Sequence, residues 1–232
     1  MATNKLENSY KIMSQFTFNL ENKPALGRND FIVSESNLDA IRWIDNWPNW
    51  PHNSSGLNVV GPKSSGKTHL GSVWCSLSKA EWVNAPITDG IRVPDILKNG
   101  QHIVLDNFNH TWPGVPLLHL YNLVRERKGF MLIISNIPVA QLGIAPDDLA
   151  SRLSTIPVVA IKPPDDFLLK EVMLKLFKDR QIAVESGVVD YLVLRMERSF
   201  EEALRLVNLL DKEALVEKNR ITIPLASRVL KK

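Results

Sequence analysis

The chain has 232 residues, of which 44% are hydrophobic and 23% charged, as is ordinary for a globular protein of one or two domains. Its net charge is +3, and lysine and arginine are spread along the sequence, so neither a dedicated nucleic-acid-binding module nor sequence-specific DNA binding is expected. We expect a cytoplasmic protein without membrane contact, because the apolar runs are too short to cross a bilayer, the start is no secretory signal, and Cys75 has no second cysteine to pair with.

The first part of the chain is predicted to hold a flexible segment followed by one helix. Residues 1–22 are expected to be flexible. Residues 36–47 have apolar positions at helical spacing after Ser36, a suitable N-cap, and two prolines end the helix. The three tryptophans of this region are expected to pack against the core, with a surface for a partner as the alternative; they are Trp43, Trp47 and Trp50.

From residue 57 onward, short apolar strands alternate with helical patterns. Continuous apolar runs are typical of strands that are covered on both faces, as in a parallel sheet with crossover helices. We therefore predict an α/β core with a central parallel sheet over residues 23–162. Its strands are expected at residues 57–61, 81–84, 102–107, 130–135 and 158–162, and one crossover helix at residues 116–127.

The pattern changes after Pro163 and Pro164, where the strands stop. Three amphipathic helices follow, with apolar residues three and four positions apart. Residues 163–232 are therefore predicted to form a small all-α lid domain, hinged near the two prolines. Its helices are expected at residues 165–180, 187–196 and 200–218.

The segment GPKSSGKT, Gly61 to Thr68, fits the P-loop pattern G-x-x-x-x-G-K-[ST] at every fixed position. It follows a predicted strand and begins a predicted helix, which is the context that the motif requires. Backbone N–H groups of such a loop, together with the helix N-terminus, hold phosphate. Lys67 is expected to reach the β- and γ-phosphates of ATP or ADP, and the Thr68 hydroxyl to bind Mg²⁺.

Asp106 is predicted to lie at the carboxyl end of a strand, where α/β sheets bind ligands. Its expected role is to hold the magnesium ion, with capping of a turn as the alternative. The residue after it is Asn107, whose side chain cannot take a proton from water. We therefore expect the chain to bind nucleotide but to be a poor ATPase by itself.

From about residue 24 to its end, the chain resembles the AAA+ ATPases, and within them the bacterial replication initiator DnaA. Residues 30–40, DFIVSESNLDA, are similar to a segment of the initiator that lies against the adenine. Residues 133–138, IISNIP, resemble the end of the sensor-1 strand, and residues 198–204, RSFEEAL, the sensor-2 motif of the lid. The P-loop and this resemblance together give the expected nucleotide-contacting residues: Phe31, Val33, Asn37, Gly61, Pro62, Ser64, Ser65, Gly66, Lys67, Thr68, His69, Asp106, Asn136 and Arg198.

The segment DLASRL, residues 148–153, resembles the AAA+ box that contains the arginine finger, which implies this role for Arg152. Two of the implied arginine roles have simpler alternatives. Arg152 could only pair with Asp147 or Asp148 on its own helix, and Arg198 could be a solvated arginine at a helix start. Asn136 could likewise be an ordinary turn residue.

The chain ends directly after the lid region, where the initiator continues with a DNA-binding domain, and it carries QFTFNL at residues 15–20. That peptide is similar to the clamp-binding sequence Q-L-x-L-P-L; an amphipathic strand packed on the core is the alternative. Together these features resemble the family of regulatory inactivators of DnaA (Hda/HdaA). The resemblance implies that Gln15, Phe16, Phe18 and Leu20 bind the DNA-loaded sliding clamp of DNA polymerase III, and that Arg152 makes DnaA hydrolyse its ATP.

Other functions remain open at this stage. An AAA+ helicase loader also joins a DnaA-like core to a recruitment peptide, although the lack of a basic stripe argues mildly against it. A scaffold that recruits the clamp without nucleotide is a second alternative. The sequence also leaves undecided whether the chain forms a homodimer through the Arg152 side. A small-molecule kinase is the least favoured reading, because no substrate-binding carboxylate or general base stands out.

Overall fold

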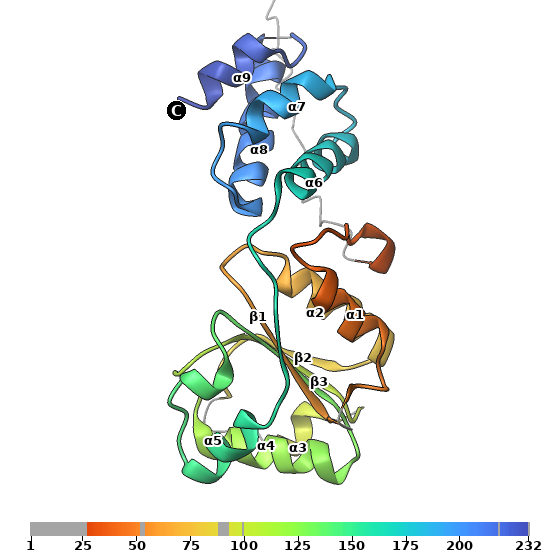
Figure 1. Ribbon diagram of the computed structural model, residues 1–232, viewed down its shortest axis with the longest axis vertical. Helices are drawn as coiled ribbons and strands as arrows, with labels where there is room; N and C mark the ends of the chain where they lie inside the picture. Colours follow the sequence, from red (N-terminus) through yellow and green to blue (C-terminus); the bar gives the residue numbers. More distant parts are fainter. Residues whose placement is uncertain (1–26, 52–53, 88–92, 99, 218, 232) are drawn as a thin grey trace, which may run out of the picture.

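A computed structural model describes residues 27–51, 54–87, 93–98, 100–217 and 219–231. The described chain forms two bodies, an α/β core and a helical domain stacked on one end of it (Figure 1). No described helix is long and apolar enough to cross a membrane.

The core is built on a parallel sheet of five strands in the order β2-β3-β4-β1-β5. The strands are β1 (Gly56–Val60), β2 (Glu81–Val83), β3 (Ile103–Phe108), β4 (Met131–Ser135) and β5 (Val158–Ala160). The predicted α/β core with a parallel sheet is confirmed. Because β1 lies between β4 and β5, the loop that follows β1 emerges from within the sheet rather than from its edge.

Alternate residues of the strands face two separate apolar clusters, so both faces of the sheet are covered. On one face lie α1 (Leu38–Asp45) and α2 (Lys67–Ser78), which pack on side chains such as Val59, Val104 and Leu132. The other face packs Leu105 and Ile133 against three helices. These are α3 (Val93–Ile96), α4 (Gly114–Glu126) and α5 (Asp147–Ser154), and the core also contains the 3₁₀ turns η1 (Arg28–Asp30) and η3 (Val139–Gln141).

The three tryptophans in α1 and after it pack against the core, as expected. Trp50 is buried and stacks on Trp74 of α2 with ring centroids 5.8 Å apart, while Trp43 and Trp47 are partly buried in the same cluster. The predicted start of this helix was wrong. The helix begins at Leu38, one residue after Asn37, and the Ser36 hydroxyl instead shares a hydrogen bond with the Ser34 hydroxyl. Local hydrogen bonds among these polar residues thus compete with helix capping.

The helical domain contains α6 (Asp166–Asp179), α7 (Ser186–Val193), α8 (Phe200–Glu217) and α9 (Ile223–Val229). It has its own apolar cluster, to which Met173, Phe177 and Leu206 contribute. Asp165 caps α6 by accepting a hydrogen bond from the Leu168 N–H at 2.7 Å. The helical region is confirmed, but the sequence pattern did not predict α9, whose seven residues are too few to show a clear period.

Candidate functional site

The loop between β1 and α2 needs glycine at two positions. Gly66 has a φ of +91°, a left-handed conformation that glycine adopts without strain. At Gly61, a Cβ atom would lie 2.5 Å from the backbone oxygen of Ile161, which follows β5. The two glycines of the motif are therefore both required by the backbone itself.

A cavity of about 430 Å³ opens beside this loop. Its lining comes from the carboxyl ends of three neighbouring parallel strands. Residues 63–68 follow β1, residues 106–109 end β3 or follow it, and residues 134–136 end β4 or follow it. The structure thus places Asp106 and Asn136 in one cavity with the loop, at the edge of the sheet where α/β proteins bind ligands.

The chemistry of this cavity fits a phosphate group. Lys67 is only 8% exposed, and its ammonium donates to the backbone oxygens of Gly61 at 2.8 Å and Pro62 at 2.6 Å. Burial lowers the pKa of Lys67, and the nearby Asp106 charge partly opposes this shift. Ser65 lines the same cavity, and its buried hydroxyl has no partner among the described residues. An anion would stabilise the buried ammonium and give the hydroxyl a partner.

Thr68 and Asp106 approach each other across this cavity. The Thr68 hydroxyl lies 3.2 Å and 3.4 Å from the two carboxylate oxygens of Asp106. A hydroxyl and a carboxylate are oxygen ligands of the kind that Mg²⁺ prefers. The described residues contain no cluster of three or more His, Cys, Asp or Glu suited to a metal, so such an ion would take its other ligands from water and phosphate.

Asn107 lies in a β-bulge, which the sequence pattern did not predict. Leu105 pairs with Ile133 and Phe108 with Ser135, so β3 contains one extra residue between these pairs. Asn107 has a φ of +54°, and its backbone N–H donates to the Asp106 carboxylate at 2.8 Å. Asparagine tolerates the left-handed region better than most residues, which gives a backbone reason for asparagine here. Its exposed side chain reaches the cavity lining but brings no carboxylate.

A second cavity, of about 400 Å³, lies between the core and the helical domain. It shares residues 64–66 of the loop with the first cavity, so the two cavities adjoin at this loop. Its remaining walls come from residues 30–32, Asn37 and His69 on the core side and from α6 and α8 on the other side. The walls are mainly apolar, which suits a flat ring more than a phosphate.

Of the three residues predicted within residues 30–40 to contact the nucleotide, two line this cavity and one does not. Phe31 lines it and packs edge-on against His69, with ring centroids 5.1 Å apart. Asn37 lines it too, but its side chain is bound to the Ile32 carbonyl and the Ser34 N–H, both at 3.0 Å, so it orders this segment. Val33 does not line the cavity and packs on the apolar cluster of α1 and α2. Burial lowers the pKa of His69, which favours a neutral ring.

Contacts that join the two domains surround this cavity, and no sequence pattern predicts them. The Lys175 ammonium of α6 pairs with Asp30 at 2.7 Å. Glu201, at the start of α8, accepts a hydrogen bond from the Ser64 hydroxyl at 3.1 Å and lies 3.7 Å from the Lys63 ammonium. These side chains hold the helical domain over the loop.

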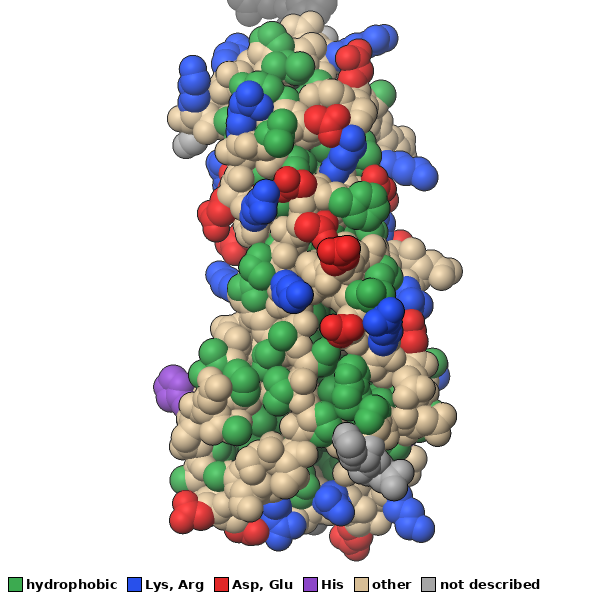
Figure 2. Space-filling view, viewed as in Figure 1, with side chains coloured by type: hydrophobic (Ala, Val, Ile, Leu, Met, Phe, Trp, Pro, Cys, Tyr) green, Lys and Arg blue, Asp and Glu red, His purple; other side chains and the backbone are tan. Residues whose placement is uncertain are grey.

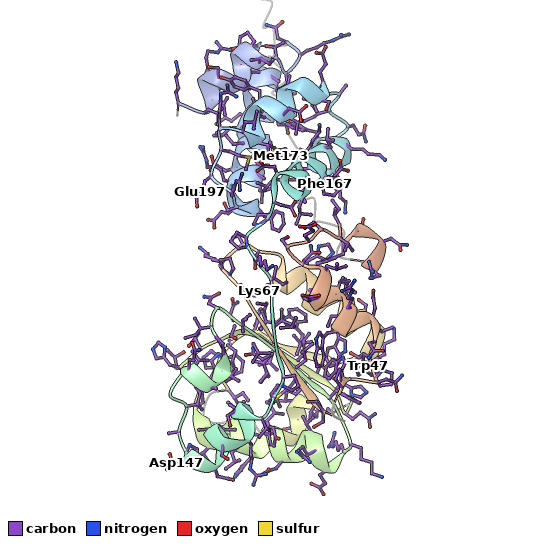
Figure 3. The ribbon with its side chains drawn as sticks, viewed as in Figure 1. Trp47, Lys67, Asp147, Phe167, Met173 and Glu197 are labelled. Atoms are coloured by element: carbon purple, nitrogen blue, oxygen red, sulfur yellow. The ribbon has the colours of Figure 1, made fainter. Side chains whose placement is uncertain are left out.

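Neither of the two arginines expected from the resemblance lines one of these two cavities. Arg198 lines neither cavity and pairs with Asp166 at 2.9 Å. Arg152 lies on α5, where its Nε donates to Asp148 at 2.9 Å and its guanidinium carbon is 5.9 Å from the centre of the Tyr121 ring. Figure 3 labels Asp147 of the same helix at the far end of the core from Lys67. Residues 15–20, including Gln15, Phe16, Phe18 and Leu20, lie outside the described residues.

Residues 170–230 match the family model described as "Hda, lid domain". The structure is similar to domain III of the replication initiation protein DnaA from Thermotoga maritima, with a TM-score of 0.75 and 16% identity over 90% of this chain and 96% of that one. It is also similar to AMPPCP-bound DnaA from Aquifex aeolicus, with a TM-score of 0.64 and 18% identity over 83% of this chain and 66% of that one.

A sequence relative comes from Haemophilus influenzae, where an uncharacterized protein is 23% identical over 203 residues, 77% of this chain and 84% of its own length. The fold of the core, the loop at its sheet edge and the helical domain agree with the likeness to DnaA, and the family match covers most of the helical domain. Residues 170–230 therefore belong to the family described as the Hda lid domain, and the chain as a whole has the fold of DnaA domain III.

Proposed function

We propose that the chain binds ADP or ATP with Mg²⁺ at the two cavities that adjoin at residues 64–66 of the loop. The phosphates occupy the loop cavity beside Lys67, and the adenine occupies the apolar cavity beside Phe31 and His69. Thr68 and Asp106 hold the magnesium ion, which neutralises phosphate charge when bound. AMPPCP, an adenine nucleotide analogue, is bound by the DnaA of Aquifex aeolicus, which has the same fold. Asn136, at the end of β4, contacts the terminal phosphate.

We further propose that the chain is a negative regulator of replication initiation, which acts by making DnaA hydrolyse its ATP. The position of Arg152 carries this proposal. It lines neither nucleotide cavity, its side chain is 40% exposed, and its helix α5 carries Asp147, which lies at the far end of the core from Lys67 (Figure 3), so Arg152 is accessible to a partner rather than to the chain's own nucleotide. This geometry is the one that an arginine finger supplied in trans requires.

The surroundings of Arg152 prepare it for this role. Asp148 binds its Nε, and the Tyr121 ring lies beside its guanidinium, so the side chain is oriented before a partner arrives. The terminal nitrogen atoms remain available to donate to a phosphate. A guanidinium in this position would neutralise charge that develops on the γ-phosphate of the partner's ATP.

The chain's own nucleotide has a structural role in this proposal. Asn107 supplies no carboxylate to orient or activate water, so hydrolysis by the chain alone is slow. The nucleotide instead fills the space between the core and the lid, next to Lys175 and Glu201, and holds the two domains together. Recruitment to the DNA-loaded sliding clamp through Gln15, Phe16, Phe18 and Leu20 stays part of the proposal on sequence resemblance alone.

The face in Figure 2 shows Lys and Arg mixed with Asp and Glu over both domains, without a continuous basic stripe. This mixture gives no support for direct DNA binding on the visible face. Contacts with protein partners, rather than with DNA, therefore carry the proposed function.

The test is phosphate release from ATP-loaded DnaA in the presence of clamp on DNA. Wild type should accelerate release, and Arg152→Ala should remove about 10³-fold or more of the stimulation. Arg42→Ala is the matched control, because Arg42 also pairs with an aspartate on its own helix but lies on α1. Equal stimulation by Arg152→Ala and wild type would refute the finger. If wild type binds clamp without any stimulation, a scaffold role takes its place.

A further inference from the structure

Asn58 is a fully buried polar residue in β1, an interior strand of the sheet. A buried amide is costly unless its hydrogen bonds are made. The hydrogen bonds of the Asn58 side chain all go to one segment, residues 133–139. Its Nδ2 donates to the Ile133 carbonyl at 3.1 Å and to the Ser135 hydroxyl at 2.9 Å, and its Oδ1 accepts from the Val139 N–H at 3.0 Å.

Ser135 extends this network across the turn that follows β4. Its hydroxyl accepts from Asn58 and donates to the Ile137 carbonyl at 2.7 Å. The bonds therefore fix residues 133, 135, 137 and 139, on both sides of Asn136. Asn136 is the one residue of this turn that lines the loop cavity.

The same network also joins two walls of that cavity. Val60, the last residue of β1, pairs with Ser135 of β4, and the nucleotide loop begins at the next residue, Gly61. An apolar residue at position 58 would fill the space between the strands, but it could not bind the turn. The amide side chain of Asn58 is thus explained by its hydrogen bonds to the turn and not by packing within the sheet.

We propose that Asn58 is a positioning residue, which acts through Ser135 to set Asn136 against the terminal phosphate of the nucleotide. The inference deepens the proposed function and rests on it. Because Asn136 is assigned to the terminal phosphate, loss of its position weakens ATP binding more than ADP binding. A purely structural role for Asn58 would weaken the two ligands equally.

The experiment is a double-mutant cycle on the full chain, with the affinities for MgATP and MgADP measured by calorimetric titration. Asn136→Ala should lower the ratio of ATP to ADP affinity by about tenfold, the value of one hydrogen bond to a charged group. Asn58→Leu and Ser135→Ala should each lower this ratio by a large part of that factor. Neither should lower it further when combined with Asn136→Ala.

Ser135→Ala keeps the inference testable if Asn58→Leu fails to fold, because it removes the relay without changing β1. Ser78→Ala is the matched control: Ser78 is also buried and donates to a backbone carbonyl, that of Trp74 at 2.7 Å, but lies outside both nucleotide cavities. An unchanged affinity ratio in Ser135→Ala, or effects that add to Asn136→Ala, would overturn the inference while nucleotide binding stands. A wild type that binds neither nucleotide would overturn the proposed function and this inference with it.

Discussion

The Ser64 hydroxyl at the nucleotide loop donates a hydrogen bond to the Glu201 carboxylate at the start of α8, over 3.1 Å. The two residues are 137 positions apart in the sequence, and this contact joins the core to the lid. Lys63 lies 3.7 Å from the same carboxylate. The Glu201 carboxylate thus holds two donors of the loop, on Ser64 and Lys63, that the phosphates of the proposed nucleotide would also use.

Glu201→Gln should therefore raise the affinity for MgATP and MgADP. The gain should be about threefold at low ionic strength, within the range of exposed charge pairs, and smaller in 0.5 M salt because salt screens exposed charges. Titrations with fluorescent nucleotides at two salt concentrations measure it. Glu197→Gln is the control, since it removes the same charge from an exposed position of the lid outside both cavities. A weaker affinity in Glu201→Gln would mean that the carboxylate assists nucleotide binding.

Asp106→Asn should remove the effect of magnesium on ATP binding. The amide keeps an oxygen that can accept from the Asn107 N–H, so the bulge is retained, but it loses the charge that holds the ion. In wild type, Mg²⁺ should tighten ATP binding; in the variant this gain should fall by about tenfold. ATP titrations with Mg²⁺ and with EDTA give the comparison, and Asp39→Asn on α1 serves as the control. An identical response to Mg²⁺ in wild type and variant would exclude Asp106 from the metal site.

Asn107→Gly should leave stability nearly unchanged, whereas Asn107→Val should lower the free energy of unfolding by about 1–2 kcal/mol. The reason is the positive φ of +54° at this position, which glycine adopts easily and a β-branched residue does not. Urea unfolding followed by circular dichroism measures both variants. Equal stability of the valine and glycine variants would show that the bulge does not constrain residue 107.

Acidification below neutral pH should destabilise the protein in the absence of nucleotide. Burial lowers the pKa of His102 below its ordinary value of 6.5, and the Phe130 N–H donates to its Nδ1, which must therefore be unprotonated. The unfolded chain binds the proton more tightly, so stability is full above pH 6.5 and decreases as the pH falls through that value, until it levels off below the folded pKa.

Urea midpoints at pH 7.5 and 5.5 test this dependence in wild type and His102→Gln. Glutamine offers an oxygen to the Phe130 N–H but does not titrate, so the difference between the two midpoints should shrink. It should not vanish, because burial also lowers the pKa of His69. A variant whose midpoint falls as much as that of wild type would remove His102 as a source of the effect.

Local sequence patterns were sufficient to predict several features of the fold and of the site. Short and mostly apolar runs identified all five strands, because strands covered on both faces have few polar positions. The spacing of glycine, lysine and threonine identified the loop after β1, where Gly66 is needed for its positive φ and Gly61 for the close approach of the Ile161 backbone. The position of the acidic residue at the end of β3 followed from the same strand pattern.

The contacts between residues far apart in the sequence could be known only from the folded chain. Asn58 and Asn136 are joined by the pairing of β1 with β4, and Glu201 reaches the loop because the lid stacks on that end of the core (Figure 1). No periodicity predicts the bulge at Asn107, because it arises from the pairing of β3 with β4. The place of α5, whose Asp147 lies at the far end of the core from Lys67 (Figure 3), is likewise a result of long-range packing, because packing between distant elements is encoded in no single stretch of the chain.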